Sequence, residues 1–182
     1  MHLVISCNLK PHSRTRILAR QTFDVLCEWN EPVDLVDLQD YASALERDDA
    51  EDPEIQELSA KIAAADSVLL ATPIYHFDVG STTKHLIELT TKAWKHKVVG
   101  ILGTAAGRRN YMALTGLANS LMLEFHCLIV PYFVVATPES FDGDVLTGSR
   151  ALRRMDDLTR TASQWAAAAA AMRGSRQIRR SH

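Results

Sequence analysis

The segment SVLLATPIYHFDVGSTTK, Ser67 to Lys84, decides the fold class of this chain. Its first residues form a short apolar run that predicts a buried strand, and the residues after Lys84 follow a helical pattern. Pro73 withholds a backbone donor and fixes φ, so we expect the chain to leave the sheet there and to free the neighbouring backbone amides. A strand that ends in Thr-Pro-x-Tyr before a turn of small residues suits a loop laid against a flat ligand, although an ordinary βα loop has the same pattern.

Short apolar runs alternate with longer helical patterns along the rest of the chain. The predicted strands are 3–6, 33–38, 67–72, 98–103 and 128–136. The predicted helices are 14–29, 53–65, 82–95, 109–125 and 149–173. This strict alternation predicts an α/β fold with a five-stranded parallel sheet and helices on both faces. We therefore expect a single domain over residues 1–173, followed by a basic, flexible tail over residues 174–182.

Composition and charge narrow the function classes. With 182 residues, of which 47% are hydrophobic and 23% charged, the chain suits one soluble domain. The formal net charge of −2 argues against a nucleic-acid binder. Cys7, Cys27 and Cys127 are odd in number and lack metal-type spacing, so we expect reduced thiols in a cytoplasmic protein and no metal site. We expect no signal peptide, because the apolar start, Met1 to Ser6, has only the length of one strand before the sequence turns polar. We expect no membrane contact, since the longest apolar helical run, Trp165 to Met172, is too short to span a bilayer.

Two predicted helices are apolar on more than one side. Helix 109–125 has a core stripe at Leu114, Leu117, Leu121 and Phe125. Met112, Met122 and Leu123 lie off that stripe, and helix 82–95 is apolar over a similarly wide arc. Either the core of a monomer is thick here or the extra faces meet in a homo-oligomer. We favour the second interpretation, a homodimer or homotetramer.

The loop between the first predicted strand and helix, Ser6 to Arg16, carries the features of an anion site. It lies at the carboxyl edge of the sheet, where doubly wound folds bind ligands, and it leads into a helix start with free N–H groups. Short donors and cations along it are Ser6, Asn8, Lys10, Ser13, Arg14 and Thr15. A capped helix start with exposed bases is the alternative. The loop has neither Gly-x-Gly-x-x-Gly nor a P-loop, so a terminal monophosphate fits it better than a longer phosphate chain.

A third loop, Gly103 to Asn110, follows the fourth predicted strand. Its small residues let the backbone approach a ligand closely. The loops after strands 1, 3 and 4 would then line one edge of the sheet. We expect a phosphate in the first and a planar ring between the other two.

With these loops in place, the chain resembles the NAD(P)H-dependent FMN reductase family, which has a flavodoxin-like fold. The matching pieces are Ser13-Arg14-Thr15-Arg16, Thr72-Pro73-Ile74-Tyr75-His76 and Lys84, within a region of roughly residues 1 to 140. The resemblance implies a three-layer fold with strand order 2-1-3-4-5, FMN as cofactor and NADPH or NADH as electron donor. The apolar Ile74 resembles the branch that supplies reduced flavin to monooxygenases, so a flavin-dependent monooxygenase is an expected partner.

The resemblance also implies roles for single residues. FMN phosphate contacts would come from Ser6, Asn8, Lys10, Ser13, Arg14 and Thr15, and ring contacts from Pro73, Ile74, Tyr75, His76, Thr104, Ala105 and Gly107. The chain departs from the family at Lys10, where Arg is common, and at Ala105-Ala106, where the family has a glycine pair. Arg108 and Arg109 are candidates for the 2′-phosphate of NADPH, or are solvent arginines at a helix start.

No catalytic side chain is expected, because hydride passes from the nicotinamide to flavin N5 and the chemistry belongs to the cofactor. Tyr75 and His76 would position the rings. An FMN-containing quinone, azo-dye or metal-ion reductase would share the same site and differ in its electron acceptor. A one-electron carrier of the flavodoxin kind and a protein-binding member without flavin are the remaining alternatives.

Overall fold

The computed structural model describes the backbone of residues 1–179, and the side chains of all of these except Arg108 and residues 173–179. The strands are β1 His2–Ser6, β2 Val33–Asp37, β3 Ser67–Tyr75, β4 Asp78–Val79, β5 Val98–Thr104, β6 Leu128–Ile129, β7 Val134–Ala136, β8 Phe141–Asp142 and β9 Val145–Leu146. The α-helices are α1 Arg14–Glu28, α2 Ala42–Arg47, α3 Pro53–Ala64, α4 Ser81–Leu89, α5 Ala113–Phe125 and α6 Ser149–Arg179. Short 3₁₀ helices are η1 Leu38–Tyr41, η2 Thr91–Trp94, η3 Arg108–Met112 and η4 Pro138–Ser140.

The main sheet has the predicted strand order. Along it the strands run β2-β1-β3-β5-β6, and the pairs β1–β2, β1–β3, β3–β5 and β5–β6 are all parallel. The predicted count of five strands is wrong, because the sheet has seven. β4 adds a short antiparallel pair to the end of β3, and the predicted strand 128–136 is split into β6 and β7, which both pair with β5.

The split of the last strand has a local cause. Pro131 lies in the predicted strand and has no N–H to donate to a ladder. The edge chain advances five residues from Ile129 to Val134 while β5 advances three from Val99 to Leu102, so two extra residues bulge out. An edge position tolerates this interruption.

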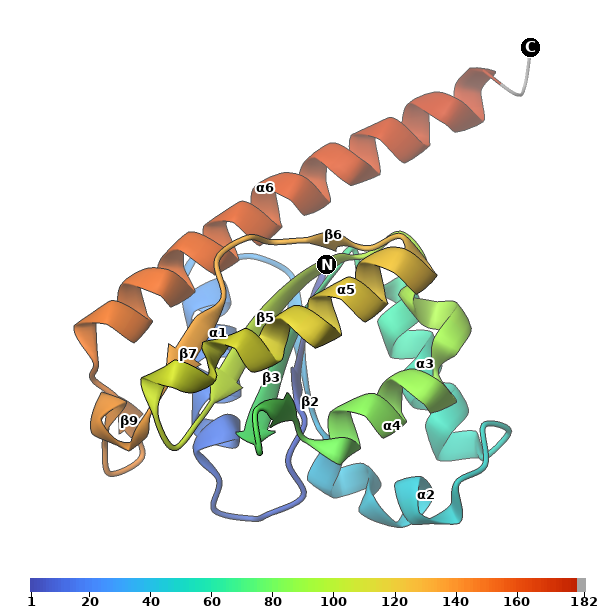
Figure 1. Ribbon diagram of the computed structural model, residues 1–182. Coiled ribbons are helices and arrows are strands. Elements are labelled where there is room, and N and C mark those ends of the chain that lie inside the picture. Colours follow the sequence, from blue (N-terminus) through green and yellow to red (C-terminus); the bar gives the residue numbers. More distant parts are fainter. Residues whose placement is uncertain (180–182) are drawn as a thin grey trace.

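Helices cover both faces of the sheet, as predicted (Figure 1). One buried cluster joins Leu3 and Ile5 of β1 to α3, α4 and α5, and another joins Val4 to α1 and α6. This division follows the alternation of side chains along a strand. α6 packs directly on the middle of the sheet, because a Cβ at Gly100 of β5 would lie 2.8 Å from Cδ2 of Leu158. No helix in the described part of the chain has the length and apolar character needed to cross a bilayer.

The expected exit of the chain at Pro73 is wrong. β3 continues to Tyr75, and Pro73 pairs with Thr104 of β5. β1 has already ended there, since its last pair joins Ser6 to Ala71. The missing N–H of Pro73 therefore costs no ladder bond, and the carbonyl oxygen of Pro73 accepts from the N–H of Gly80 at 2.8 Å.

Several smaller elements differ from the predicted ones. The acidic stretch at residues 46–54, which lies between predicted elements, is partly ordered: α2 extends into it, and Arg47 Nε pairs with Asp52 Oδ2 at 2.5 Å. The predicted helix 53–65 is α3, which begins at Pro53 and is capped by Asp52, whose side chain accepts from the N–H of Glu54. The predicted helix 82–95 is α4 followed by η2. α6 continues to Arg179. Residues 180–182 lie outside the described part of the chain, and the division at residue 173 stays a prediction.

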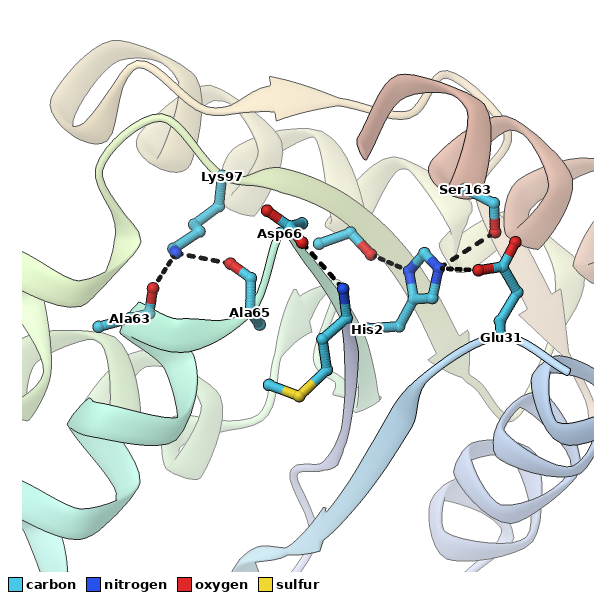
Figure 2. Close-up of polar contacts among 9 residues, drawn as sticks. His2, Glu31, Ala63, Ala65, Asp66, Lys97 and Ser163 are labelled. Carbon is cyan, nitrogen blue, oxygen red and sulfur yellow. Dashed lines mark hydrogen bonds and ion pairs between the residues drawn. The ribbon is translucent and has the colours of Figure 1, made fainter. Parts of the chain in front are cut away.

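At the amino edge of the sheet, a polar cluster joins strand starts to α6 (Figure 2). The ring of His2 is buried, with Nδ1 at 2.5 Å from Ser67 Oγ and Nε2 at 3.3 Å from Ser163 Oγ. Nε2 also lies 3.4 Å from Glu31 Oε2. Beside it, the Lys97 ammonium donates to two backbone carbonyls of the segment before β3. Burial lowers the pKa of His2 below its ordinary value, against the opposing effect of Glu31.

The lowered pKa of His2 predicts a loss of stability in mild acid. The ring is favoured neutral in the folded state, so once the pH falls below about 6.5 the unfolded chain binds more protons and the free energy of unfolding decreases. We expect the wild type to lose stability between pH 7.5 and pH 5.5 and the His2→Gln variant to lose less, as measured by urea unfolding. His12→Gln, at an exposed histidine, is the control. The same pH dependence in the His2→Gln variant as in the wild type would contradict this account.

Candidate functional site

A cleft of about 1040 Å³ opens at the carboxyl edge of the sheet. Its walls are the loop after β1, the first turns of α1, the end of β3, the loop after β5 and the segment after β7. This is the edge at which doubly wound sheets bind ligands. The three loops expected to meet at one edge therefore do so.

The start of α1 is arranged to receive an anion. Ser13 is the N-cap: its Oγ accepts from the N–H of Arg16 at 3.1 Å, which leaves its own O–H free to donate. The first intrahelical bonds run from Arg16 and Ile17 to the carbonyl oxygen of Ser13. The N–H groups of Arg14 and Thr15 precede those bonds, so they have no intrahelical acceptor. With no acidic residue in the first turn, this helix start carries a partial positive charge that no carboxylate of the same turn neutralises.

The cations of the first loop have different roles. Arg16 is already engaged: its Nε lies 2.8 Å from Asp37 Oδ2, and its Nη1 donates to Gln39 Oε1 at 3.0 Å. These contacts tie the loop to the end of β2. Arg14 and Lys10 are exposed and, within the described residues, form no ion pair. They are the cations available to an anionic ligand.

Two polar residues support the loop from below. Asn8 lines the cleft, and its Oδ1 accepts from the N–H of Lys10 at 3.0 Å. Ser6 is buried beneath the cleft and does not line it. Its Oγ has no hydrogen-bond partner among the described residues, which is uncommon for a buried hydroxyl.

A hydroxyl pair joins the first loop to the loop after β5. Thr15 Oγ1 and Thr104 Oγ1 lie 2.7 Å apart, and Thr15 is almost fully buried. The N–H of Ala105 donates to the carbonyl oxygen of Ala136 at 3.0 Å, which fixes the start of that loop on β7. The two sides of the cleft are therefore held at a defined separation.

The end of β3 supplies a second wall. Pro73, Ile74 and Tyr75 line the cleft together with Ala105. The side chain of Ile74 packs into the core, because a Cβ at Gly103 would lie 2.8 Å from its Cδ1. Tyr75, by contrast, is 49% exposed. The wall thus offers a proline ring, a tyrosine and backbone groups to a planar ligand.

His76 and Gly107 do not line the cleft. His76 and Phe77 occupy the two-residue turn between β3 and β4, with φ of 50° and 61° in the left-handed region. Such values carry strain for residues with side chains. The hairpin is held by an ion pair between Lys84 and Asp78, which lowers the pKa of the Asp78 carboxyl. Lys84, part of the predicted motif, therefore braces the hairpin.

Ten of the thirteen predicted site residues line the same cleft. They are Asn8, Lys10, Ser13, Arg14, Thr15, Pro73, Ile74, Tyr75, Thr104 and Ala105. Ser6, His76 and Gly107 lie outside its lining. The side chain of Arg108 lies outside the described part of the chain, and Arg109 is exposed and does not line the cleft.

Sequence reasoning missed one end of the cleft. On α1 the lining continues along Ile17, Arg20, Gln21 and Asp24, and the facing wall comes from Pro138, Gly143, Asp144 and Val145. The α1 positions recur at helical spacing on one face. The facing segment turns at Gly143-Asp144, between the paired residues Asp142 and Val145, and a two-residue Gly-Asp turn is a hairpin signal. Both patterns were visible in the sequence.

The buried cysteines are unsuited to nucleophilic chemistry. Burial raises the pKa of the Cys7 thiol to about 12 and that of Cys127 to about 11. Both thiols are therefore protonated at neutral pH. Within the described residues, no group of three or more His, Cys, Asp or Glu side chains is placed to hold a metal ion.

The capping role of Ser13 predicts a stability effect independent of any ligand. Ser13→Ala removes the acceptor of the Arg16 N–H, and we expect it to lower the free energy of unfolding by about 1 kcal/mol. Urea unfolding measures the difference. Ser120→Ala, at an exposed serine of α5, should change stability by less than about 0.5 kcal/mol. Equal stabilities of the two variants would show that the cap contributes nothing.

Comparison with known proteins adds a family and a fold. The sequence profile of the family described as NADPH-dependent FMN reductase matches residues 2–142. The apo form of an NADH:FMN oxidoreductase, EmoB, is 20% identical with a TM-score of 0.70, over 88% of this chain and 88% of that chain. The NAD(P)H:(acceptor) oxidoreductase FerB from Paracoccus denitrificans is 22% identical with a TM-score of 0.70, over 91% and 96%. A flavodoxin from the domain Archaea is 10% identical with a TM-score of 0.59, over 90% and 99%, so the predicted flavodoxin-like fold is confirmed.

Proposed function

The chain belongs to the family of NADPH-dependent FMN reductases, and on this premise we propose that its cleft binds FMN with the phosphate at the first turn of α1 and the ring against the end of β3. Family membership confirms the expected class of activity. The protein is a flavin oxidoreductase that uses FMN and takes electrons from NAD(P)H.

The helix start at Ser13 is the observation that carries the placement of the phosphate. Free N–H groups at Arg14 and Thr15, the donating hydroxyl of Ser13 and the unpaired charges of Arg14 and Lys10 all belong to residues that line the cleft at this helix start. No carboxylate of the first turn opposes an anion there. A phosphate monoester suits this set of donors.

The ring would lie between Tyr75 and the loop that begins at Ala105. When bound, FMN supplies N5 as the hydride acceptor. The side chains of this chain would orient the ring and keep water from its face, which is a matter of positioning rather than acid–base chemistry. Pro73 and Tyr75 face the cleft, and Thr104 holds the opposite loop through its bond to Thr15.

We propose that reduced flavin is passed to an acceptor outside this chain, such as a flavin-dependent monooxygenase, in the cytoplasm. The apolar Ile74 between Pro73 and Tyr75 supports a monooxygenase as the acceptor. The three free cysteines support a reducing compartment such as the cytoplasm. A quinone, azo-dye or metal-ion reductase would use the same cleft. Turnover with each class of acceptor distinguishes them.

FMN binding tests the placement of the phosphate. Titration of the purified protein with FMN should perturb the flavin absorbance bands, and anaerobic NADPH should then bleach them. Arg14→Ala should raise the Kd for FMN about 10- to 150-fold, because one charge-assisted contact is lost. Arg153→Ala, at an exposed arginine of α6, is the matched control. An unperturbed flavin spectrum at high FMN would refute the function, and an unchanged Kd in Arg14→Ala would refute the phosphate site.

We also propose that α5 forms an interface between copies of this chain. Met112, Met122 and Leu123 remain 54%, 46% and 72% exposed on and beside this helix. The wide apolar arc of α4 and η2 has another explanation, because Leu86 and Trp94 are fully buried in the core. The interface proposal is therefore confined to α5.

A charge on the exposed face of α5 tests this interface. Met122→Glu should shift the protein to a smaller species in size-exclusion chromatography, because a carboxylate would be buried without a partner. Met172→Glu, at an exposed methionine of α6, is the control. An unchanged elution volume for Met122→Glu would exclude that face of α5 from any interface.

A further inference from the structure

The cleft extends along α1 beyond the first turn, between the helix and the β8–β9 hairpin. We call this region the α1 arm and define it by Arg20, Gln21, Asp24, Gly143, Asp144 and Val145. We propose that the α1 arm binds the adenosine phosphate half of a dinucleotide. The proposal rests on the proposed function, in which the flavin ring and its phosphate occupy the rest of the cleft.

The arm is spatially separate from the phosphate position at the helix start. At 1.5 Å per residue, the Cα of Arg20 lies roughly 10 Å along the helix axis from that of Ser13. Ile17, Arg20 and Asp24 recur at intervals of three and four residues, so they share the face of α1 that lines the cleft. A group held at Arg20 is therefore distinct from an anion held at Ser13, yet continuous with it through one cleft.

The facing wall is fixed on the helix. Gln21 Oε1 accepts from the N–H of Leu146 at 2.7 Å, and Leu146 is buried. At the base of the hairpin, the N–H groups of Thr147 and Gly148 both donate to the carbonyl oxygen of Ser140, at 2.8 Å and 3.0 Å. Figure 1 shows the hairpin beside α1, at the same end of the sheet as the first loop. The arm is thus a built groove with two anchored sides.

The chemistry of the arm matches a ribose phosphate with a base. Arg20 lies over the ring of Phe23 at 5.7 Å and, among the described residues, has no carboxylate partner, so its guanidinium is available to a phosphate. Asp24 and Asp144 offer carboxylates that accept hydrogen bonds from ribose hydroxyls, as acidic residues do in other nucleotide sites. Val145 is 53% exposed and presents an apolar surface to a base.

Two ligands share this chemistry, namely NADPH or NADH and the dinucleotide form of the flavin, FAD. Both carry an adenosine phosphate, and both must also reach the ring position at Tyr75 in the same cleft. The family match ends at residue 142, and Gly143, Asp144 and Val145 of the hairpin follow it directly. This wall of the groove therefore lies outside the part of the chain that the family profile describes.

Calorimetric titration of the full chain with adenosine 5′-diphosphate (ADP), with and without saturating FMN, tests the arm directly. We expect ADP to bind in both cases, because FMN and the arm ligand occupy different parts of the cleft. Arg20→Ala should weaken ADP binding roughly tenfold or more and leave the Kd for FMN unchanged. Arg154→Ala is the matched control, because Arg154 also lies over an aromatic ring, that of Tyr132 at 5.6 Å, away from the cleft.

Kinetics and cofactor affinity then identify the source of the adenosine phosphate. A raised KM for NADPH in Arg20→Ala, with FAD affinity unchanged, assigns the arm to the pyridine nucleotide. A weakened affinity for FAD alone assigns it to the flavin dinucleotide. The proposed arm would be overturned by any of three results: ADP does not bind, FMN displaces it completely, or Arg20→Ala binds it as tightly as the wild type does. Failure of FMN to bind is a separate result, which removes the proposed function, and the ADP titration then tests the arm by itself.

Discussion

β3 pairs in parallel with β1 up to Ser6 and Ala71, and with β5 up to Pro73 and Thr104. This register determines where the loops of the site meet. β1 ends two residues before the β3–β5 ladder does, and the N–H of buried Cys7 donates to the carbonyl oxygen of Ala71 where the loop after β1 begins. The loop after β5 begins on the other side of the same strand. The cleft lies where the two loops diverge from β3, as expected where neighbouring strands connect in opposite directions along a sheet.

The sequence was sufficient to predict the strand order, the layers and most of the cleft, because each depended on a periodic pattern or on a loop at a strand end. It was misleading where long-range pairing overrode a local signal. Pro73 has the local character of a strand terminator, yet it remains in the sheet because β1 is absent beside it. Pro131 acts as expected of a proline, and its edge position turns a break into a bulge between two short strands.

Residue roles within the site were harder to predict than its location. Arg14 and Arg16 are equivalent in the sequence, but only Arg16 meets Asp37 and Gln39, which come from the end of β2 and the residues after it. Ile74 sits in the predicted motif, yet its side chain fills the space above Gly103. Such distinctions depend on the partners that the fold brings together, and no local pattern encodes them. The β8–β9 hairpin was missed for a different reason: its strands are too short to show a period, so the Gly143-Asp144 turn is the signal that could have found it.

The bond between the hydroxyls of Thr15 and Thr104 gives the cleft a property that neither loop has alone. It joins the loop proposed to hold a phosphate to the loop proposed to face a ring. Because both threonine side chains are short, the bond restricts the relative movement of the two loops. The distance between those two positions is then set by the protein before any ligand arrives. The cleft would therefore select flavins by the length of the chain that joins the ring to the phosphate. A flavin with a longer or shorter chain could place its ring or its phosphate correctly, but not both.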